Sequence, residues 1–98
     1  MHRTSRHSVD LALYADVLAG EAASLAARIE RERGKQRQAS IEREARAALA
    51  PLAVERLEEL GLLATRADVA TIADLEESLD AIELLQAWVE GALARDAA

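Results

Sequence analysis

The segment RIERERGKQRQASIEREAR, residues 28–46, decides how this chain folds, because its charged middle can either join two helices or continue one. Gly34 can end a helix, and the basic residues around it suit a helix C-terminus. Ser40 can then cap a new helix, whose first turn holds two glutamates. We therefore expect a turn between these two residues and a helical hairpin. The alternative is one long helix, because a glycine inside a helix costs only about 1 kcal/mol and the residues KQRQ are good helix formers.

Apolar periodicity on both sides of this segment predicts three helices, at about residues 9–33, 40–60 and 66–95. In the first helix, leucines recur every seven residues, at Leu11, Leu18 and Leu25. In the second helix, Pro51 removes a backbone hydrogen bond, so a kink or break is expected just before it, near residues 47–50. Gly61 supplies a stop, followed by a leucine placed for the apolar contact of a Schellman cap.

The third helix has the clearest start and the clearest apolar stripe. Thr65 followed three residues later by Asp68 is similar to a capping box, so the helix is expected to begin at Arg66. Its apolar face is expected to repeat at alternating spacings of three and four, with one polar member, at Ile72, Leu75, Leu79, Ile82, Gln86, Val89 and Leu93. Such a stripe is typical of a helix that packs along another helix.

These elements predict an all-α protein, a three-helix antiparallel bundle or helical hairpin with coiled-coil-like seams, and oligomeric. Residues 1–8 are expected to form a disordered or frayed tail, and residues 9–95 a single helical domain. Ninety-eight residues suffice for one small domain. Of these residues 23 are Ala and 15 are Leu, with Tyr14 and Trp88 the sole aromatics, so the core is expected to be thin.

A thin core is strengthened by packing against another copy or another protein, and the first helix offers a surface for this. Alanines recur along it at alternating spacings of three and four, which would allow close approach of a second helix. Leu84, Leu85 and Trp88 widen the apolar face of the third helix. The predicted interface therefore comprises Ala12, Ala15, Ala19, Ala22, Ala26, Leu85 and Trp88. The alternative interpretation is that the alanines are present only because Ala is a strong helix former.

Candidate groups for catalysis are few. The chain has no cysteine, and its two histidines, His2 and His7, lie in the expected tail without carboxylates at a metal-binding spacing. Glu76, Asp80 and Glu83 share a helix face, but no matching Glu and His pair is evident on another helix, so we read them as a solvated face. We expect no enzyme activity, no cofactor and no metal. The absence of a long apolar run or a secretory signal leads us to expect a cytoplasmic protein.

The function expected from these features is association, either by self-assembly or as a small accessory or adaptor subunit of a larger protein. One alternative is nucleic-acid binding or regulation through residues 28–46, which hold seven basic and four acidic groups. The net charge of −6 arises entirely from the last third of the chain and disfavours a phosphate partner. A further alternative is an amphipathic protein that coats a granule or a membrane surface through its leucine-rich face.

Overall fold

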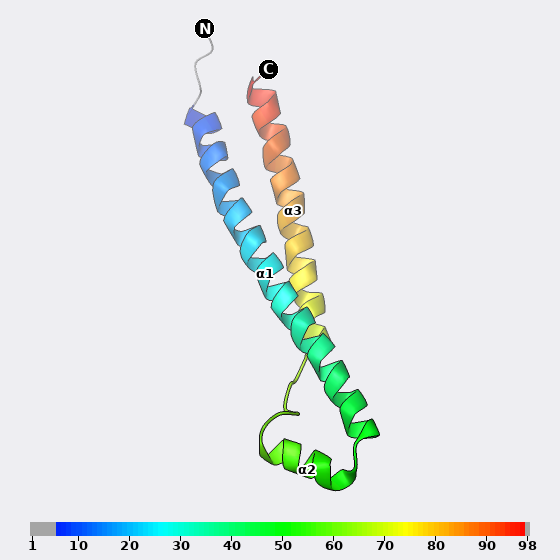
Figure 1. Cartoon of the computed structure of the whole chain (residues 1–98). Coiled ribbons are helices and arrows are strands. Elements are labelled where there is room, and N and C mark those ends of the chain that lie inside the picture. Colours follow the sequence, from blue (N-terminus) through cyan, green and yellow to red (C-terminus); the bar gives the residue numbers. More distant parts are fainter. Residues whose placement is uncertain (1–5, 98) are drawn as a thin grey trace.

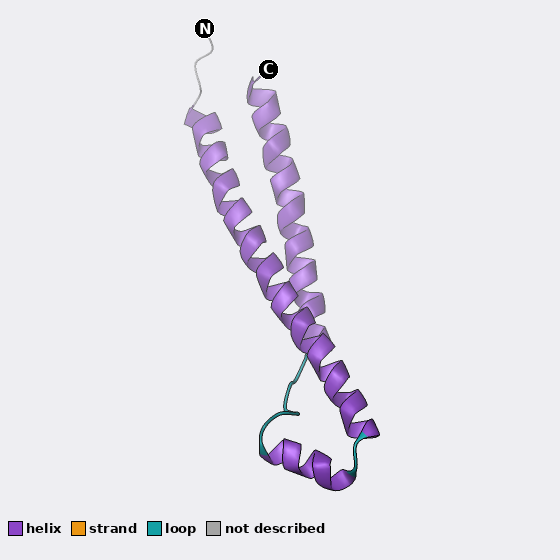
Figure 2. Cartoon of the chain, viewed as in Figure 1, coloured by secondary structure: helices purple, strands orange, loops and turns teal. Residues whose placement is uncertain are grey.

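A computed structural model describes residues 6–97, and this part of the chain consists of helices and their connecting loops (Figure 2). Helix α1 spans Arg6–Ala48, α2 spans Pro51–Glu59 and α3 spans Val69–Ala97. The all-α prediction is confirmed. Of the expected tail, residues 1–5 lie outside the described residues, as does residue 98, while residues 6–8 already belong to α1.

The two long helices lie side by side and antiparallel, and the short α2 lies at one end of the pair (Figure 1). The described start of α1 and end of α3 meet at the opposite end, where the Ser8 hydroxyl donates to Asp96 Oδ2 at 2.9 Å. The molecule is a rod with extents of 77 × 18 × 16 Å. The hairpin therefore forms between the first and third helices, and α2 contributes no buried side chain.

The expected turn at residues 34–40 is wrong, because α1 runs through the whole charged segment as one helix of 43 residues. Gly34 keeps an ordinary helical backbone, since Gly61 is the one residue with positive φ in the described chain. The charges around Gly34 are paired within the helix: Arg33 bonds Glu30 at 3.4 Å and Lys35 bonds Glu32 at 3.0 Å. Such pairs at a spacing of three stabilise helix where a terminus was expected.

The expected second helix at residues 40–60 is also wrong, because its first part extends α1. The break near Pro51 is confirmed: Ala50 has the extended angles φ −62° and ψ 144°, and Pro51 opens α2 as its first helical residue. Proline is well suited to that position, since its fixed φ is helical and its missing N–H would have no partner there. The proline thus ends one helix and begins the next.

The end of α2 follows the sequence prediction closely. Gly61 has a φ of +74°, the Gly61 N–H donates to Glu58 O at 2.9 Å, and the Leu62 N–H donates to Leu57 O at 3.0 Å. This is the hydrogen-bond pattern of a Schellman cap, which requires a residue that tolerates the left-handed region. A loop then leads back along the end of α1 to α3.

The expected start of the third helix at Arg66 is wrong by one turn, because Thr65 is not its cap. Asp68 has that role: its Oδ1 accepts the Ala70 N–H at 3.0 Å and its Oδ2 accepts the Thr71 hydroxyl at 3.0 Å. The carboxylate also places negative charge at the positive end of the helix. Thr65 instead accepts a hydrogen bond from Gln38 Nε2 at 2.9 Å, which ties the loop to α1.

The core is a single row of contacts between α1 and α3. Its central cluster consists of Leu11 and Leu18 from α1 with Val89 and Ala92 from α3. Val89 alone is completely buried among the large side chains of the described residues. Because only one row of side chains separates the two helices, the thin core expected from composition is what the fold provides.

Candidate protein-interaction surface

The seam between the two long helices is formed by residues that are buried or half-buried on both sides. On α3 these include the whole predicted stripe, which is thereby confirmed as the face turned toward α1. On α1 the corresponding positions alternate at spacings of four and three, at Leu11, Ala15, Leu18, Ala22, Leu25, Ile29 and Glu32. Every other surface of the hairpin can be located relative to this seam.

The antiparallel arrangement gives the hairpin two distinct edges. A residue that follows a seam position by one lies about 100° around its helix, and on antiparallel helices such residues from both partners fall on the same side. Arg33 and Glu76 verify this geometry, because each follows a seam residue and their side chains meet at 2.6 Å across the helices. Residues that precede a seam position by one occupy the opposite edge.

The edge of preceding residues carries exposed apolar side chains on both helices in the half of the hairpin near the described start of α1. Tyr14 and Val17 precede the seam residues Ala15 and Leu18 on α1, and Trp88 precedes the seam residue Val89 on α3. Leu84 lies one helical turn before Trp88 on the same face of α3. We call these four residues the apolar edge: Tyr14, Val17, Leu84 and Trp88, with exposures of 43%, 58%, 75% and 57%. Large apolar side chains at such exposure, gathered on one edge, are typical of a protein-interaction site.

The predicted interface residues divide between three places. Ala15, Ala22 and Leu85 are half-buried, and Ala15 and Leu85 pack against the core cluster, so they are occupied within the hairpin. Three exposed alanines follow seam positions and form what we call the alanine edge: Ala12, Ala19 and Ala26. Trp88 belongs to the apolar edge on the other side. The helical geometry therefore does not bring Trp88 together with the exposed alanines.

The predicted interface contained Trp88 but not Tyr14 or Val17, and Leu84 was predicted only to widen the apolar face of the third helix. The signal for Tyr14 and Val17 was present, because each lies one position before a seam residue. That signal becomes readable only when the first helix is known to pair with the third, because the pairing decides which flanks face the same way.

The alanine edge carries acidic residues where α3 adjoins it. Glu76, Glu83 and Glu90 all follow seam or core positions on α3 and so lie on this side of the hairpin. Arg33 neutralises one of them, and its hydrogen bond and charge interaction with Glu76 raise the pKa of Arg33 above its usual value. The alanine edge is therefore polar where the opposite edge is apolar, which makes it the weaker candidate for a protein contact.

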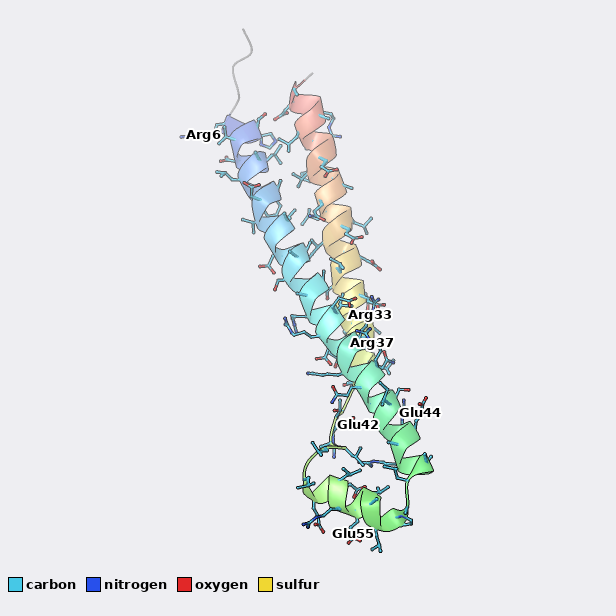
Figure 3. All side chains as sticks on the ribbon, viewed as in Figure 1. Arg6, Arg33, Arg37, Glu42, Glu44 and Glu55 are labelled. Atoms are coloured by element: carbon cyan, nitrogen blue, oxygen red, sulfur yellow. The ribbon has the colours of Figure 1, made fainter. Side chains whose placement is uncertain are left out.

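At the far end of the rod, the loop before α3 packs on the part of α1 that α3 does not cover. Figure 3 shows Glu42 directed toward this loop. Glu42 is 8% exposed, and its Oε1 accepts the Thr65 N–H at 3.4 Å. Arg46 donates to the carbonyl oxygen of Leu63 and lies 3.7 Å from Glu58. These polar contacts hold the loop and α2 against the end of α1.

A hollow of about 750 Å³ opens beside Glu42, and its lining includes Arg43 and Arg46 from α1 and Arg66 from the loop. The Glu42 Oε2 atom has no hydrogen-bond partner among the described residues, but it is fully covered by protein atoms. A ligand in the hollow would not reach that oxygen without a rearrangement of the loop. The hollow therefore has the character of a gap under a loop and not of a built binding site.

Other classes of site find little support in the described residues. No group of three or more metal-ligating side chains comes together within residues 6–97. None of the helices described combines the length and apolar character needed to cross a bilayer. Comparisons of the chain with protein-family models, with curated proteins and with solved structures find no match. The arrangement of the side chains alone therefore directs the functional proposal.

Proposed function

We propose that this chain is a non-enzymatic helical association module, which acts by binding a second copy of itself or a larger protein through its apolar edge. The observation that supports the proposal is the exposure of Tyr14, Val17, Leu84 and Trp88 together on one side of the hairpin. Aromatic residues are enriched at protein interfaces because they bury a large area at a small entropy cost.

The thin core supports the same proposal. Two helices that contact each other along one face leave their other faces exposed to water, and large apolar side chains lie on those faces. Burial of apolar surface stabilises by about 25 cal/mol per Å², so covering the apolar edge would strengthen a fold with few buried residues. Association would thus contribute both function and stability.

The test compares charge placed on each edge of the hairpin. In one variant Leu84→Asp and Trp88→Asp alter the apolar edge, and in the matched control Ala19→Asp and Ala26→Asp alter the alanine edge. All four positions are exposed, so neither variant removes a core contact. Circular dichroism verifies that both variants remain helical before any binding is compared.

The readout is the mass of the species that contains the untagged protein in extracts of the cells that produce it, measured by gradient sedimentation. We expect the wild type and the alanine-edge control to sediment as a complex heavier than the 10.6 kDa chain. The apolar-edge variant should sediment as the free chain. A wild type that sediments alone, or a complex that survives the apolar-edge substitutions, would reject the proposal.

A further inference from the structure

We infer that the occupant of the apolar edge is a second copy of this chain, related by a two-fold axis parallel to the rod, so that two hairpins form a four-helix bundle. The inference rests on the proposed function and specifies its partner. In this arrangement α1 of one copy lies beside α3 of the other, and all four neighbouring helix pairs are antiparallel. Three features of the edge support it.

The first feature is the level of the apolar residues along the rod. Two contacts define the register, because Ser8 meets Asp96 and Arg33 meets Glu76. The helices are antiparallel, so a residue of α1 and the residue of α3 at the same level have numbers whose sum is nearly constant. That sum is 104 for the first pair and 109 for the second. Val17 and Trp88 add up to 105 and so share a level, and Tyr14 and Leu84 lie about one helical turn to either side of that level. A rotation about an axis along the rod leaves every level unchanged. It therefore sets the apolar residues of α1 against those of α3 in the other copy.

The second feature is complementary charge on the same edge. Asp10 precedes Leu11 at one end of the seam, and Arg95, four residues after Gly91, reaches back along the same flank of α3. These two charges share a level, and neither takes part in an ion pair within residues 6–97. The two-fold axis places Asp10 of each copy opposite Arg95 of the other. Such pairs at the rim of an interface fix register and suppress wrong arrangements.

The third feature is the available area. Helix α3 has 29 residues, which at about 1.5 Å per residue gives a length of about 43 Å. With the 18 Å width of the molecule, one face of the paired region covers roughly 800 Å². Specific protein interfaces bury about 800 Å² on each partner, so a second hairpin is a partner of adequate size.

The decisive experiment exchanges charge between positions 10 and 95 in separate chains. Asp10→Arg gives a chain with two positive charges at these positions, and Arg95→Asp gives a chain with two negative charges. In a dimer of either variant both rim pairs become repulsive, and in the mixed dimer both become attractive. If positions 10 and 95 instead formed an ion pair within one chain, mixing the variants would not restore it, because each variant chain carries two like charges at these positions.

We expect sedimentation equilibrium of the purified wild type to show a monomer and dimer in exchange. The dissociation constant of each variant alone should rise about tenfold, and the equimolar mixture should return to within about twofold of the wild type. A mixture that associates no better than the separate variants would overturn the inference. Because both positions are near helix ends, circular dichroism must show unchanged helicity.

A distance between two labels tests the direction of the axis independently. The chain lacks cysteine, so Glu55→Cys accepts a single spin label on α2, where Figure 3 shows Glu55 at the far end of the rod. An axis parallel to the rod brings the two α2 helices to the same end, so the labels should lie closer than the 77 Å length of one molecule. Hairpins that overlap head to head at the apolar edge would separate the labels by more than that length, which would contradict the inference.

The outcomes for the inference and for the proposed function are separable. A purified wild type that stays monomeric at every concentration, while the protein in extracts sediments as a complex that the apolar-edge variant loses, would overturn the second copy as partner. The proposed function would then stand with a different protein on the same edge. A native complex that ignores the apolar-edge substitutions would reject both.

Discussion

Replacement of Val89 by alanine is the most direct test of how the hairpin is held together. Val89 is 0% exposed and lies in the cluster formed with Leu11, Leu18 and Ala92. The substitution removes two buried methyl groups, which cost about 0.8 kcal/mol each in lost transfer free energy. The cavity left behind adds a further penalty, which partial collapse of the half-buried neighbours reduces. We expect Val89→Ala to lower the free energy of unfolding by about 2 kcal/mol.

The assay is urea unfolding followed by circular dichroism, with all proteins at one concentration because association would shift the midpoint. Val69→Ala is the matched control, since it makes the same chemical change at a position that is 63% exposed at the start of α3. The control should change the free energy of unfolding by less than about 0.5 kcal/mol. Equal effects of the two substitutions, or a loss below about 0.5 kcal/mol at Val89, would refute the assignment of the core to this seam.

Two further predictions use pairs of substitutions whose effects should differ in sign or size. Gly34→Ala should stabilise the protein by about 0.5–1 kcal/mol, because the residue is inside a helix and its nearest neighbour, an arginine side chain, is 3.8 Å from an added Cβ. Gly61→Ala should instead destabilise the protein by about 1 kcal/mol, because φ is +74° at that position. Thermal unfolding compares the two variants. A destabilising effect of Gly34→Ala would indicate a turn at residue 34 and contradict the continuous helix. Asp68→Ala should lower the free energy of unfolding by about 1 kcal/mol through loss of the α3 cap, and Thr65→Ala by less than half as much. Urea unfolding measures both. A larger loss for Thr65→Ala than for Asp68→Ala would identify Thr65 as the cap instead.

The parts of the fold that the sequence predicts correctly are those with a local cause. Pro51 ends α1 and Gly61 ends α2. Both ends are predictable from the sequence, because neither effect depends on distant residues. The stripe on the third helix was also readable, since burial of one helix face imposes its period directly on the sequence. These elements would be recognised in any chain that carried them.

The errors arise where two local signals compete and a distant contact decides. Gly34 and its flanking charges suit a helix end. Ion pairs within the helix, the contact of Arg33 with Glu76 on α3 and the contact of Gln38 with Thr65 in the loop nevertheless keep α1 continuous. Thr65 and Asp68 are both good caps, and the bond from Gln38 to Thr65 leaves Asp68 to begin α3. Propensity differences of less than about 1 kcal/mol are easily outweighed by such contacts.

The candidate site depends on pairing even more strongly. Trp88 is conspicuous in any reading of the sequence, but its neighbours on the apolar edge are set by which helix lies beside α3. With the first helix as that neighbour, Tyr14 and Val17 join Trp88, and the exposed alanines fall on the other side. The composition of the edge is thus a tertiary property, and a helix-by-helix analysis does not contain it.

The pairing of the first helix with the third also bears on how the chain reaches its native state. The contact between Arg33 and Glu76 closes a segment of 43 residues, whereas the contact between Ser8 and Asp96 closes one of 88. Doubling the length of a closed loop adds only about 0.6 kcal/mol of entropic cost, which is less than the burial of one methylene group recovers. Once the inner part of the hairpin has formed, zipping outward toward the Val89 cluster is therefore downhill. The contacts most remote along the chain, those of the Val89 cluster, are then the ones that complete folding.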